Sequence, residues 1–554
     1  MDFVLALHSH LPYVLNHGRW PHGSDWLCEA AVDTYLPLLE ALEALATHGI
    51  AAPVTIGFTP VLANQLASPT FVNELEAFFE QRAAAGKETT AALAASGEPG
   101  LASLVGFWGA RFARLRALFH SIDRDILAAF RRLQDGGHLE VIGSAATHGY
   151  LPLLARDESI RLQLTVGRDE HRRLFGRAPA GCWLPECAYR PRAGARGGIE
   201  EHLAAAGFRY FFTDAHLAGA GMPLGTYAEI PLGAERFDAE RRDAPAKRAD
   251  RVDRSPYQAY SVTPPGVGRS VAALVRDPRS SMQVWSRHHG YPGDEWYLEF
   301  HKIRWPGGLK LWRVTGPNTD LGAKRPYEPG VALGKAAEHA RHFAHLLAGT
   351  AAEQGGAAPK RGAERRGVIV APFDTELFGH WWFEGVDFLA EVYGALRHHP
   401  GLRPATASQH LADHPPHAGL QLAEGSWGVN GDHTMWLNDR TAWAWPRLHA
   451  LEHAFWNAAP TALASPGARP VLAQAARELL LAQSSDWPFM ISTGAVPDYG
   501  ERRLRMHCDD AERLIAALSP GAAAVDGLVR ELARRDDLFP HILDAVAEAV
   551  EGRA

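Results

Sequence analysis

Short apolar runs alternate with longer amphipathic stretches over the first two-thirds of the chain, and this alternation limits the fold more than any other feature. It is typical of strand–helix units arranged around a parallel sheet. Seven runs qualify as strands, which is too few for a complete eightfold barrel. The sequence therefore predicts an α/β fold built on a distorted or incomplete barrel. The seven runs are Phe3–Leu7, Val54–Gly57, Leu139–Gly143, Cys182–Leu184, Tyr210–Thr213, Val271–Val275 and Val368–Phe373.

Two segments depart from this alternation. Residues 71–132 hold helical patterns broken by the small-residue stretch Lys87–Gly100, which predicts an inserted helical subdomain. Beyond about Arg403 the strand pattern stops and helical patterns continue. We therefore predict a barrel over 1–70 and 133–402, an inserted helical subdomain over 71–132, and a C-terminal helical domain over 403–554.

Two further stretches predict loops. Ala234–Ser255 is dense in Arg, Asp and Glu, which indicates either a mobile loop beside a site or a solvated surface excursion. Gly349–Gly367 is basic and rich in Ala and Gly, which indicates a flexible loop before the last strand.

The composition argues against nucleic acid and membrane as main partners. The 554 residues exceed a single ordinary domain, and 46% hydrophobic with 21% charged residues is typical of a soluble globular protein. A formal net charge of −7 leaves no basic surplus for binding phosphate or anionic lipid. The N-terminus shows no signal-peptide pattern, and no apolar run approaches the roughly 18 residues that span a bilayer. We therefore expect a cytoplasmic protein.

The cysteines support the same compartment. There are four, Cys28, Cys182, Cys187 and Cys508, and only Cys182 and Cys187 lie close together in the sequence. Their spacing is not a strong metal signature. We interpret all four as small buried hydrophobic residues in a reducing cytoplasm, rather than as metal ligands or disulfides.

Two apolar runs each end in a carboxylate set among aromatic residues. The first ends at Glu186 and the second at Asp374. Pro185 cannot donate to a strand ladder, so the strand stops there and presents Glu186 at its end. In α/β barrels the strand ends form the face where chemistry takes place. The pair therefore predicts the acid and the nucleophile of a sugar-cleaving enzyme. The aromatic walls would be Trp183, Tyr189, Trp381 and Trp382.

Both assignments have alternatives. Glu186 would be structural if it were paired with Arg190 or Arg192. Glu376 lies two residues after Asp374, on the same side if the chain stays extended, so either could be the acid. Asp374 is preferred because it is nearer the strand end, and Glu376 would then tune it or bind a hydroxyl.

Histidines follow two other predicted strands. His8 and His10 are two residues apart at a strand end, so both imidazoles can face one cavity. Such a pair suits sugar hydroxyls, but it also suits zinc or a purely structural role. Zinc would need further ligands, and the available ones, His148, Asp214 and His216, are not tightly spaced. His148 itself follows a small-residue turn that lets the backbone approach a ligand.

Further residues are candidates for substrate contact because they follow strands or lie in loops of the helical region. Each of them alone is more often core or surface than site. They are Asp214, Arg276, Asp277, Trp285, Trp427, Trp436, Ser485, Asp486 and Trp487.

Several separated motifs together resemble glycoside hydrolase family 57 and, within it, the 1,4-α-glucan branching enzymes of glycogen synthesis. The resemblance spans nearly the whole chain. It implies an incomplete (β/α)7 barrel with an inserted helical subdomain and a C-terminal all-helical domain. The motifs are His8–Tyr13, Gly143–Leu153, Trp183–Tyr189, Asp374–Trp382 and Ser484–Trp487.

The resemblance also implies roles for individual residues. Glu186 is the nucleophile and Asp374 the general acid/base of a retaining double displacement on α-1,4-glucan, with amylose or glycogen as donor and acceptor and no metal or other cofactor. Tyr257 is the candidate for a tyrosine that such enzymes carry on a mobile loop over the site, although the corresponding region here is expanded and charged. The expected subsite residues are His10, His148, Trp285, Trp427 and Trp436.

Other functions stay open at the level of sequence. Within the family they are α-amylase and 4-α-glucanotransferase. From other classes they are a metal-dependent polysaccharide deacetylase, which would use His8, His10 and an aspartate, and a glucan-binding protein without turnover.

Overall fold

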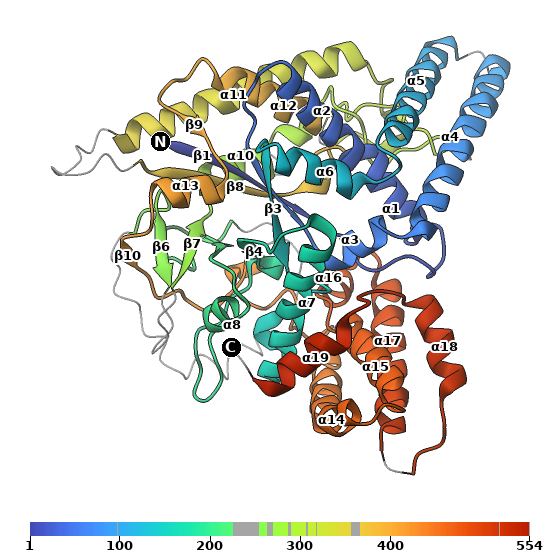
Figure 1. The fold of residues 1–554 in the computed structure, drawn as a ribbon. Helices are drawn as coiled ribbons and strands as arrows, with labels where there is room; N and C mark the ends of the chain where they lie inside the picture. The colour runs from blue at the N-terminus through green and yellow to red at the C-terminus, as the bar shows by residue number, and fades with distance from the viewer. Residues whose placement is uncertain are drawn as a thin grey trace.

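The computed structural model has a ten-stranded sheet at its centre, with helices around it and a further group of helices gathered at one end (Figure 1). It describes residues 1–96, 98–224, 254–262, 270–285, 290–305, 308–316, 318–355, 366–519 and 521–552. The sheet order is β10-β6-β7-β5-β4-β3-β2-β1-β8, and β9 also pairs with β1. The strands are β1 (Asp2–Ser9), β2 (Val54–Phe58), β3 (Leu139–Ser144), β4 (Gly181–Trp183), β5 (Tyr210–Thr213), β6 (Ala259–Val262), β7 (Val271–Val275), β8 (Val368–Asp374), β9 (Arg403–Pro404) and β10 (Ala418–Gly419).

The seven predicted strands are confirmed as β1, β2, β3, β4, β5, β7 and β8. They are parallel neighbours, and the sheet curls until its two sides meet. Arg276, directly after β7, forms a parallel bridge with Val370 of β8. The backbone N–H of Asp277 donates to the carbonyl of Val370 at 2.8 Å. This short contact, rather than a full ladder, joins the two sides in the described chain, as an incomplete barrel requires.

Three short strands were not predicted. β9 and β10 have only two residues each, too few to produce a hydrophobic pattern. β6 runs antiparallel to β7 and lies just after the charged stretch, so its four residues look like the end of a loop in the sequence.

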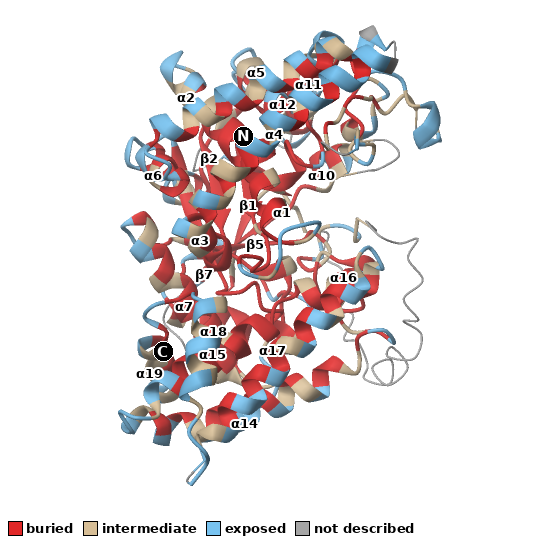
Figure 2. Ribbon diagram, turned by 90° about the vertical axis from the view of Figure 1, so that its right-hand side faces the viewer, coloured by how far each residue is buried: buried red, intermediate tan, exposed pale blue. Residues whose placement is uncertain are grey.

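The barrel strands are buried on both faces. Every residue of β1, β2, β5 and β7 is buried, and the buried colour fills the middle of the molecule in Figure 2. Helices cover the outer face of the parallel sheet, which explains why these strands read as continuous apolar runs rather than alternating ones. The covering helices are α2 (Leu36–Thr47), α3 (Pro60–Leu66), α6 (Ile126–Asp135), α7 (Asp157–Phe175), α8 (Ile199–Ala205), α10 (Pro278–Trp285), α11 (Pro329–Gly355), α12 (Gly385–Leu396) and α13 (Ala407–Asp413).

The inserted segment is a pair of long helices that project beside the barrel, α4 (Pro69–Ser96) and α5 (Pro99–Ser121) (Figure 1). The helices do break within the predicted stretch Lys87–Gly100, but the extent predicted is wrong, because α4 continues as far as Ser96 and α5 begins at Pro99. The stretch is rich in Ala, a strong helix former. Thr89 and Leu93 are buried, so tertiary packing also holds this part of α4 as helix.

The C-terminal region is helical, as predicted. Its helices are α14 (Ala444–Ala464), α15 (Arg469–Ala482), α16 (Asp486–Thr493), α17 (Pro497–Ala517), α18 (Asp526–Arg535) and α19 (Ile542–Glu551). α19 and α7 pack together, which joins this group to the barrel. The domain boundaries given above stay a prediction.

The two predicted loops have different outcomes. The start of Gly349–Gly367 is helical, since α11 reaches Gly355, and residues 356–365 lie outside the described chain. Most of Ala234–Ser255 also lies outside it, because residues 225–253 are not described.

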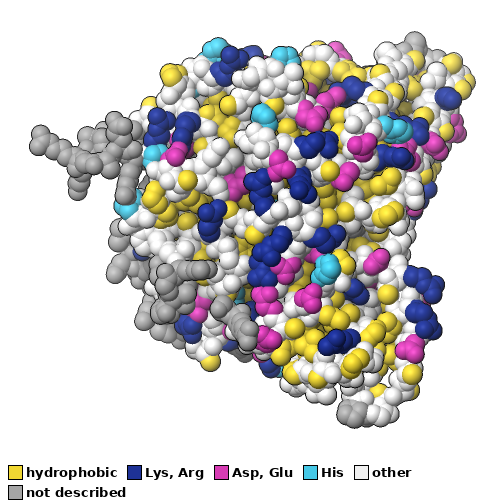
Figure 3. All heavy atoms as spheres, viewed as in Figure 1, with side chains coloured by type: hydrophobic (Ala, Val, Ile, Leu, Met, Phe, Trp, Pro, Cys, Tyr) yellow, Lys and Arg dark blue, Asp and Glu magenta, His cyan; other side chains and the backbone are white. Residues whose placement is uncertain are grey.

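The surface and the cysteines agree with the compositional argument. On the face in Figure 3, Lys and Arg side chains are interspersed with Asp and Glu. Among the described helices, none is long and apolar enough to cross a bilayer. All four cysteines are buried and unpaired, as expected.

Candidate active site

A cavity of about 500 Å³ lies at the carboxyl ends of the barrel strands. Its wall combines residues that follow β1, β3, β4, β7 and β8 with residues from the C-terminal region. The predicted site residues that line it are His8, His10, His148, Glu186, Arg276, Trp285, Asp374, Glu376, Trp381, Trp427, Trp436 and Asp486.

Glu186 is held at the cavity by a turn and two hydrogen bonds. It sits in the 3-10 turn Pro185–Cys187 with φ of 60°, in the left-handed region that non-glycine residues seldom adopt. The indole N–H of Trp427 donates to its Oε2 at 2.8 Å, and the hydroxyl of Ser485 donates to its Oε1 at 3.0 Å. Burial raises the pKa of Glu186 to about 7, although both hydrogen bonds favour the ionised form.

The structural alternative for Glu186 is excluded. Arg190 donates to the backbone carbonyls of Pro191 and Gly197, and Arg192 pairs with Glu201. Neither arginine bonds to Glu186. A buried carboxylate whose partners are a cavity-lining indole and a hydroxyl fits use in chemistry rather than in holding the fold.

Asp374 ends β8 in a different environment. Within the described chain no side-chain or backbone donor bonds its carboxylate. Burial raises its pKa well above the usual range, the negative charges of Glu376 and Glu186 raise it further, and Arg276 opposes them. Asp374 is therefore the carboxyl group of the site best suited to hold a proton at neutral pH.

Glu376 is a further carboxyl group on the wall, and it is buried. The chain does not stay extended after Asp374, because Thr375–Leu377 forms a 3-10 turn. Glu376 Oε1 accepts from the hydroxyl of Tyr35 at 2.5 Å and from the backbone N–H of His10 at 3.0 Å. Burial raises its pKa to about 7, and these two donors oppose that rise. Its oxygen is thus engaged by the protein, which leaves Asp374 as the freer proton donor.

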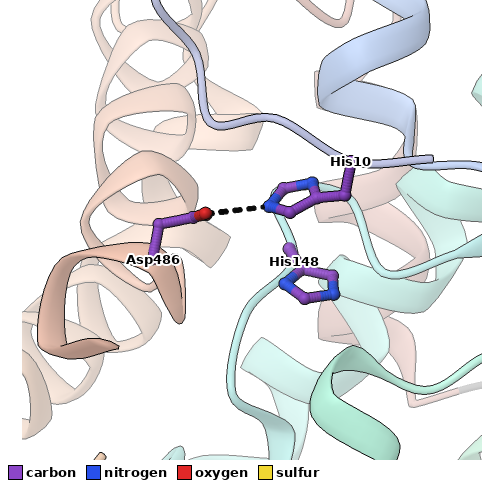
Figure 4. A group of neighbouring side chains, drawn as sticks. All are labelled: His10, His148 and Asp486. Atoms are coloured by element: carbon purple, nitrogen blue, oxygen red, sulfur yellow. Dashed lines mark hydrogen bonds and ion pairs between the residues drawn. The ribbon is translucent and has the colours of Figure 1, made fainter. Parts of the chain in front are cut away.

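Two imidazoles stack at the centre of the site (Figure 4). The rings of His10 and His148 are 4.0 Å apart between centroids. His10 Nε2 lies 2.9 Å from Asp486 Oδ2, and Figure 4 shows the carboxylate reaching the ring from the opposite side of the cavity. Burial lowers the pKa of His10, but the Asp486 carboxylate outweighs it and the net shift is upward. Asp486 therefore favours the charged form of His10.

His148 and His8 are neutral. Burial holds the pKa of each well below the usual range, and the nearby His10 lowers both further. His8 Nε2 lies 2.9 Å from His148 Nε2, and the His8 ring stacks on the indole of Trp183 at 4.6 Å. The expectation that His8 and His10 face one cavity is confirmed, since both line it.

The arrangement of these histidines disfavours a zinc site. Ligand atoms of His10, His148 and Asp486 do lie within 4.8 Å of one another. However, His148 uses one nitrogen toward His8 and the other toward Ser485, so neither is free for a metal. Of the further ligands considered, Asp214 pairs with Arg276 and His216 bonds to the carbonyl of Gly431.

Aromatic side chains form the rest of the wall. The rings of Trp285 and Trp427 approach edge to face at 6.2 Å. Trp436 is 1% exposed and stacks on Tyr150 at 4.4 Å. Gly428 permits this packing, because a Cβ there would lie 2.6 Å from the Trp436 ring. Trp381 is 42% exposed and offers an open ring at the mouth, whereas Trp382 is buried.

Not every predicted site residue lines the cavity, and several cavity residues were not predicted. Tyr257 does not line the cavity, since its hydroxyl donates to Asp277 at 3.2 Å. Cavity residues that were not predicted come from three separate places in the chain, around residues 21–26, at Phe300 and at Phe489. The dense aromatic and histidine content of residues 17–26 is the signal that could have found the first group. The missed residues include Pro21, His22, Trp26, Phe300 and Phe489.

Comparison with known proteins gives two family matches. Residues 4–423 match glycosyl hydrolase family 57, and residues 447–546 match the 1,4-alpha-glucan branching enzyme C-terminal family. A 1,4-alpha-glucan branching enzyme of Thermococcus kodakarensis is 38% identical over 97% of this chain and 77% of its own length. A probable 1,4-alpha-glucan branching enzyme of Mycobacterium tuberculosis is 31% identical over 94% of this chain and 92% of its own length.

Solved structures of similar enzymes also resemble this chain over nearly its whole length. The branching enzyme of Thermococcus kodakaraensis, in complex with glucose, superposes with a TM-score of 0.86 at 36% identity, covering 98% of this chain and 96% of that one. An alpha-amylase of Thermotoga maritima superposes with a TM-score of 0.81 at 29% identity, covering 99% of both chains.

Proposed function

The chain belongs to glycosyl hydrolase family 57, and on that basis we propose that it is a 1,4-alpha-glucan branching enzyme. Such an enzyme cleaves an α-1,4 bond of a glucan and re-forms it as an α-1,6 branch. The match to the branching enzyme C-terminal family supports this activity over the others in the same family. The observation that carries the chemistry is the pair of part-buried carboxyl groups, Glu186 and Asp374, in one cavity with opposite hydrogen-bond environments.

We assign the first step to these two groups. Asp374 donates its proton to the glycosidic oxygen while Glu186 attacks the anomeric carbon. The C–O bond to the leaving chain breaks, and a glycosyl ester forms on Glu186. The environments support the roles, because two donors stabilise charge on Glu186 whereas burial and neighbouring carboxylates favour the protonated form of Asp374.

The second step returns the proton and makes the branch. The 6-hydroxyl of an acceptor glucan gives its proton to Asp374 and attacks the anomeric carbon, which releases Glu186. Two displacements retain the α configuration. We propose that the aromatic rings of Trp285 and Trp436, with His10, His148, Trp427 and Asp486, hold the two chains. Aromatic faces in the cavity wall favour an acceptor sugar over water, which transfer requires.

Arg276 lies near Asp374 and limits the rise of its pKa. It donates to Asp214 and Ser281, both at 3.0 Å, and its guanidinium lies 5.5 Å from the centroid of the Trp427 ring. With two donors already engaged, its role near Asp374 is electrostatic, and we propose contact with substrate as secondary.

The finer biological role is also part of this proposal. Amylose and glycogen are the expected donor and acceptor, and glycogen synthesis in the cytoplasm is the expected setting. Four buried free thiols fit a reducing compartment.

Incubation with amylose tests the activity directly. New α-1,6 linkages, counted as chains released by a debranching enzyme, should appear faster than reducing ends in its absence. Reducing ends without new branches would instead establish an α-amylase, and longer linear chains a 4-α-glucanotransferase. Chelator-sensitive release of acetate from an acetylated glycan would indicate the deacetylase.

A further inference from the structure

We propose that Ser485 is a positioning residue for Glu186, placed at the end of a one-directional chain of hydrogen bonds that begins at His8 and passes through His148. The inference rests on the proposed function, since it takes Glu186 to be the nucleophile. The proposal goes further by naming the hydrogen bonds that hold the Glu186 carboxylate in place and favour its ionised form.

The chain consists of three hydrogen bonds, two buried and the last part-buried, between four segments that are distant in the sequence. His8 at the end of β1 lies 2.9 Å from His148, between the two Nε2 atoms. His148, in the turn after β3, lies 2.8 Å from Ser485, between Nδ1 and Oγ. Ser485, at the start of α16, lies 3.0 Å from Glu186, between Oγ and Oε1. All except Glu186 are at most 4% exposed.

The direction of every proton follows from the carboxylate end. An ionised Glu186 can only accept, so the hydroxyl of Ser485 donates to it. The oxygen of Ser485 then accepts from His148, which must carry its proton on Nδ1. His148 is neutral, so its Nε2 has a lone pair and accepts from the Nε2–H of His8.

The beginning of the chain is consistent with this assignment. A neutral His8 that donates from Nε2 has a lone pair on Nδ1. His8 Nδ1 is buried and has no hydrogen-bond partner within the described chain. No acceptor there competes for the proton, and no donor there forces the opposite tautomer.

The consequence lies in how each oxygen of Glu186 would take up a proton. Oε2 faces the indole N–H of Trp427, which can only donate. Oε1 faces the hydroxyl of Ser485, which donates to it while accepting from His148. A proton on Oε2 would weaken the bond from Trp427, and a proton on Oε1 would force the Ser485 hydroxyl to turn away, so both donors favour the ionised form. Asp374 has no such donors in the described chain, so the network selects Glu186 as the anion of the pair.

Other charged and titratable groups also face Glu186, and they would remain in a Ser485 variant. From after β1 comes His10, from α16 Asp486, and from β8 Asp374. Tyr150 after β3 and the adjacent Cys187 also face it, and His148 Nδ1 itself lies 3.7 Å from Glu186 Oε1. Apart from His148, which belongs to the chain, none of these bonds to Ser485, so a change on removing its hydroxyl reports on the chain itself.

The test compares Ser485→Ala with Ser485→Thr and with Ser492→Ala. Ser492 lies on the same helix, is fully buried and accepts a hydrogen bond from Asn438, so its loss controls for removing a buried hydroxyl. An aryl maltooligosaccharide is the substrate, so that the measurement does not depend on branch formation. Thermal unfolding midpoints confirm that each variant folds.

For Ser485→Ala we expect kcat to fall about 10- to 100-fold, as for loss of a hydrogen bond to a charged group, with KM little changed. The acid limb of the pH profile should move to higher pH by roughly one unit. Ser485→Thr should restore most of kcat, and Ser492→Ala should match the wild type. An unmoved acid limb in Ser485→Ala would overturn the proposal, and so would loss of kcat in Ser492→Ala of the same size.

A direct readout is the tautomer of His148, measured by 15N NMR of protein labelled at histidine and assigned with His148→Gln. The expected state is neutral with the proton on Nδ1, and a proton on Nε2 would overturn the chain direction. Failure of the wild type to branch amylose would refute the proposed function while leaving both of these tests in force.

Discussion

Replacing Trp427 by Phe should move the pH dependence of the first chemical step. The substitution keeps an aromatic ring in the wall but removes the indole N–H, which donates to Glu186 Oε2 at 2.8 Å. A hydrogen bond to a charged group is worth about 1.5–3 kcal/mol. Because only the ionised form of Glu186 gains from it, losing the bond should raise the pKa of Glu186 by about one to two pH units.

The sign and size of the rate effect follow. The pKa of Glu186 is about 7 in the native protein, so about half of the molecules carry the nucleophilic carboxylate at pH 7. Raising that pKa by one to two units leaves about 1–10% ionised, which lowers kcat/KM at pH 7 by about 5- to 50-fold. Activity should recover as the pH rises through the new pKa.

The assay is the pH profile of kcat/KM with an aryl maltooligosaccharide, measured between pH 5 and 9. Trp285→Phe is the matched control, since Trp285 also lines the cavity but its indole N–H has no hydrogen-bond partner in the described chain. Its acid limb should stay in place. The reasoning fails if Trp427→Phe leaves the acid limb where it is, or if both substitutions move it equally.

Three further predictions concern the acid Asp374, Gly428 in the cavity wall, and the bond between Tyr35 and Glu376. Asp374→Asn should slow cleavage of unactivated glucan by about 10²–10⁴-fold and much less for a substrate with a good leaving group; an equal loss for both would contradict the acid role. Gly428→Ala should cost about 1–3 kcal/mol of unfolding free energy, because the added methyl would lie 2.6 Å from the ring of Trp436, and unchanged denaturant midpoints would refute this contact. Tyr35→Phe removes a donor to Glu376 and should lower the unfolding free energy by about 1–3 kcal/mol. The loss should be smaller at low pH, because Glu376 is then protonated and gains less from the donor. Chemical denaturation at pH 5 and pH 8 checks the size of the loss and whether it grows with pH.

The barrel was readable from the sequence because its strands are buried on both faces. A run such as Val368–Phe373 has no polar residue to mask it, and its ends fall within one residue of β8. By contrast, the boundary of α4 depends on packing of Thr89 and Leu93 that no local pattern reveals. Elements of two residues, such as β9, exist only because β1 lies beside them.

The sequence predicted most of the residues that line the candidate site, but not the hydrogen bonds between them. Strand ends marked Glu186 and Asp374, because a polar residue directly after a buried run is easy to see. The role of Trp427 as a hydrogen-bond donor was not visible, since a tryptophan near a sugar site suggests stacking first. The pairing of His148 with Ser485 was also out of reach, because the two are 337 positions apart and meet only through the fold. Tyr257 is a candidate only through the resemblance, as a tyrosine on a loop over the site, and in the structure its hydroxyl donates to Asp277.

The assignment of the nucleophile can be tested most directly by trapping the covalent intermediate. A fluorinated maltosyl fluoride should form a glycosyl ester that accumulates, and peptide mass spectrometry after acid quenching locates it. We expect the sugar to be attached to Glu186. A sugar attached to Asp374 or Glu376 instead, or inactivation with the label on none of the three, would contradict it.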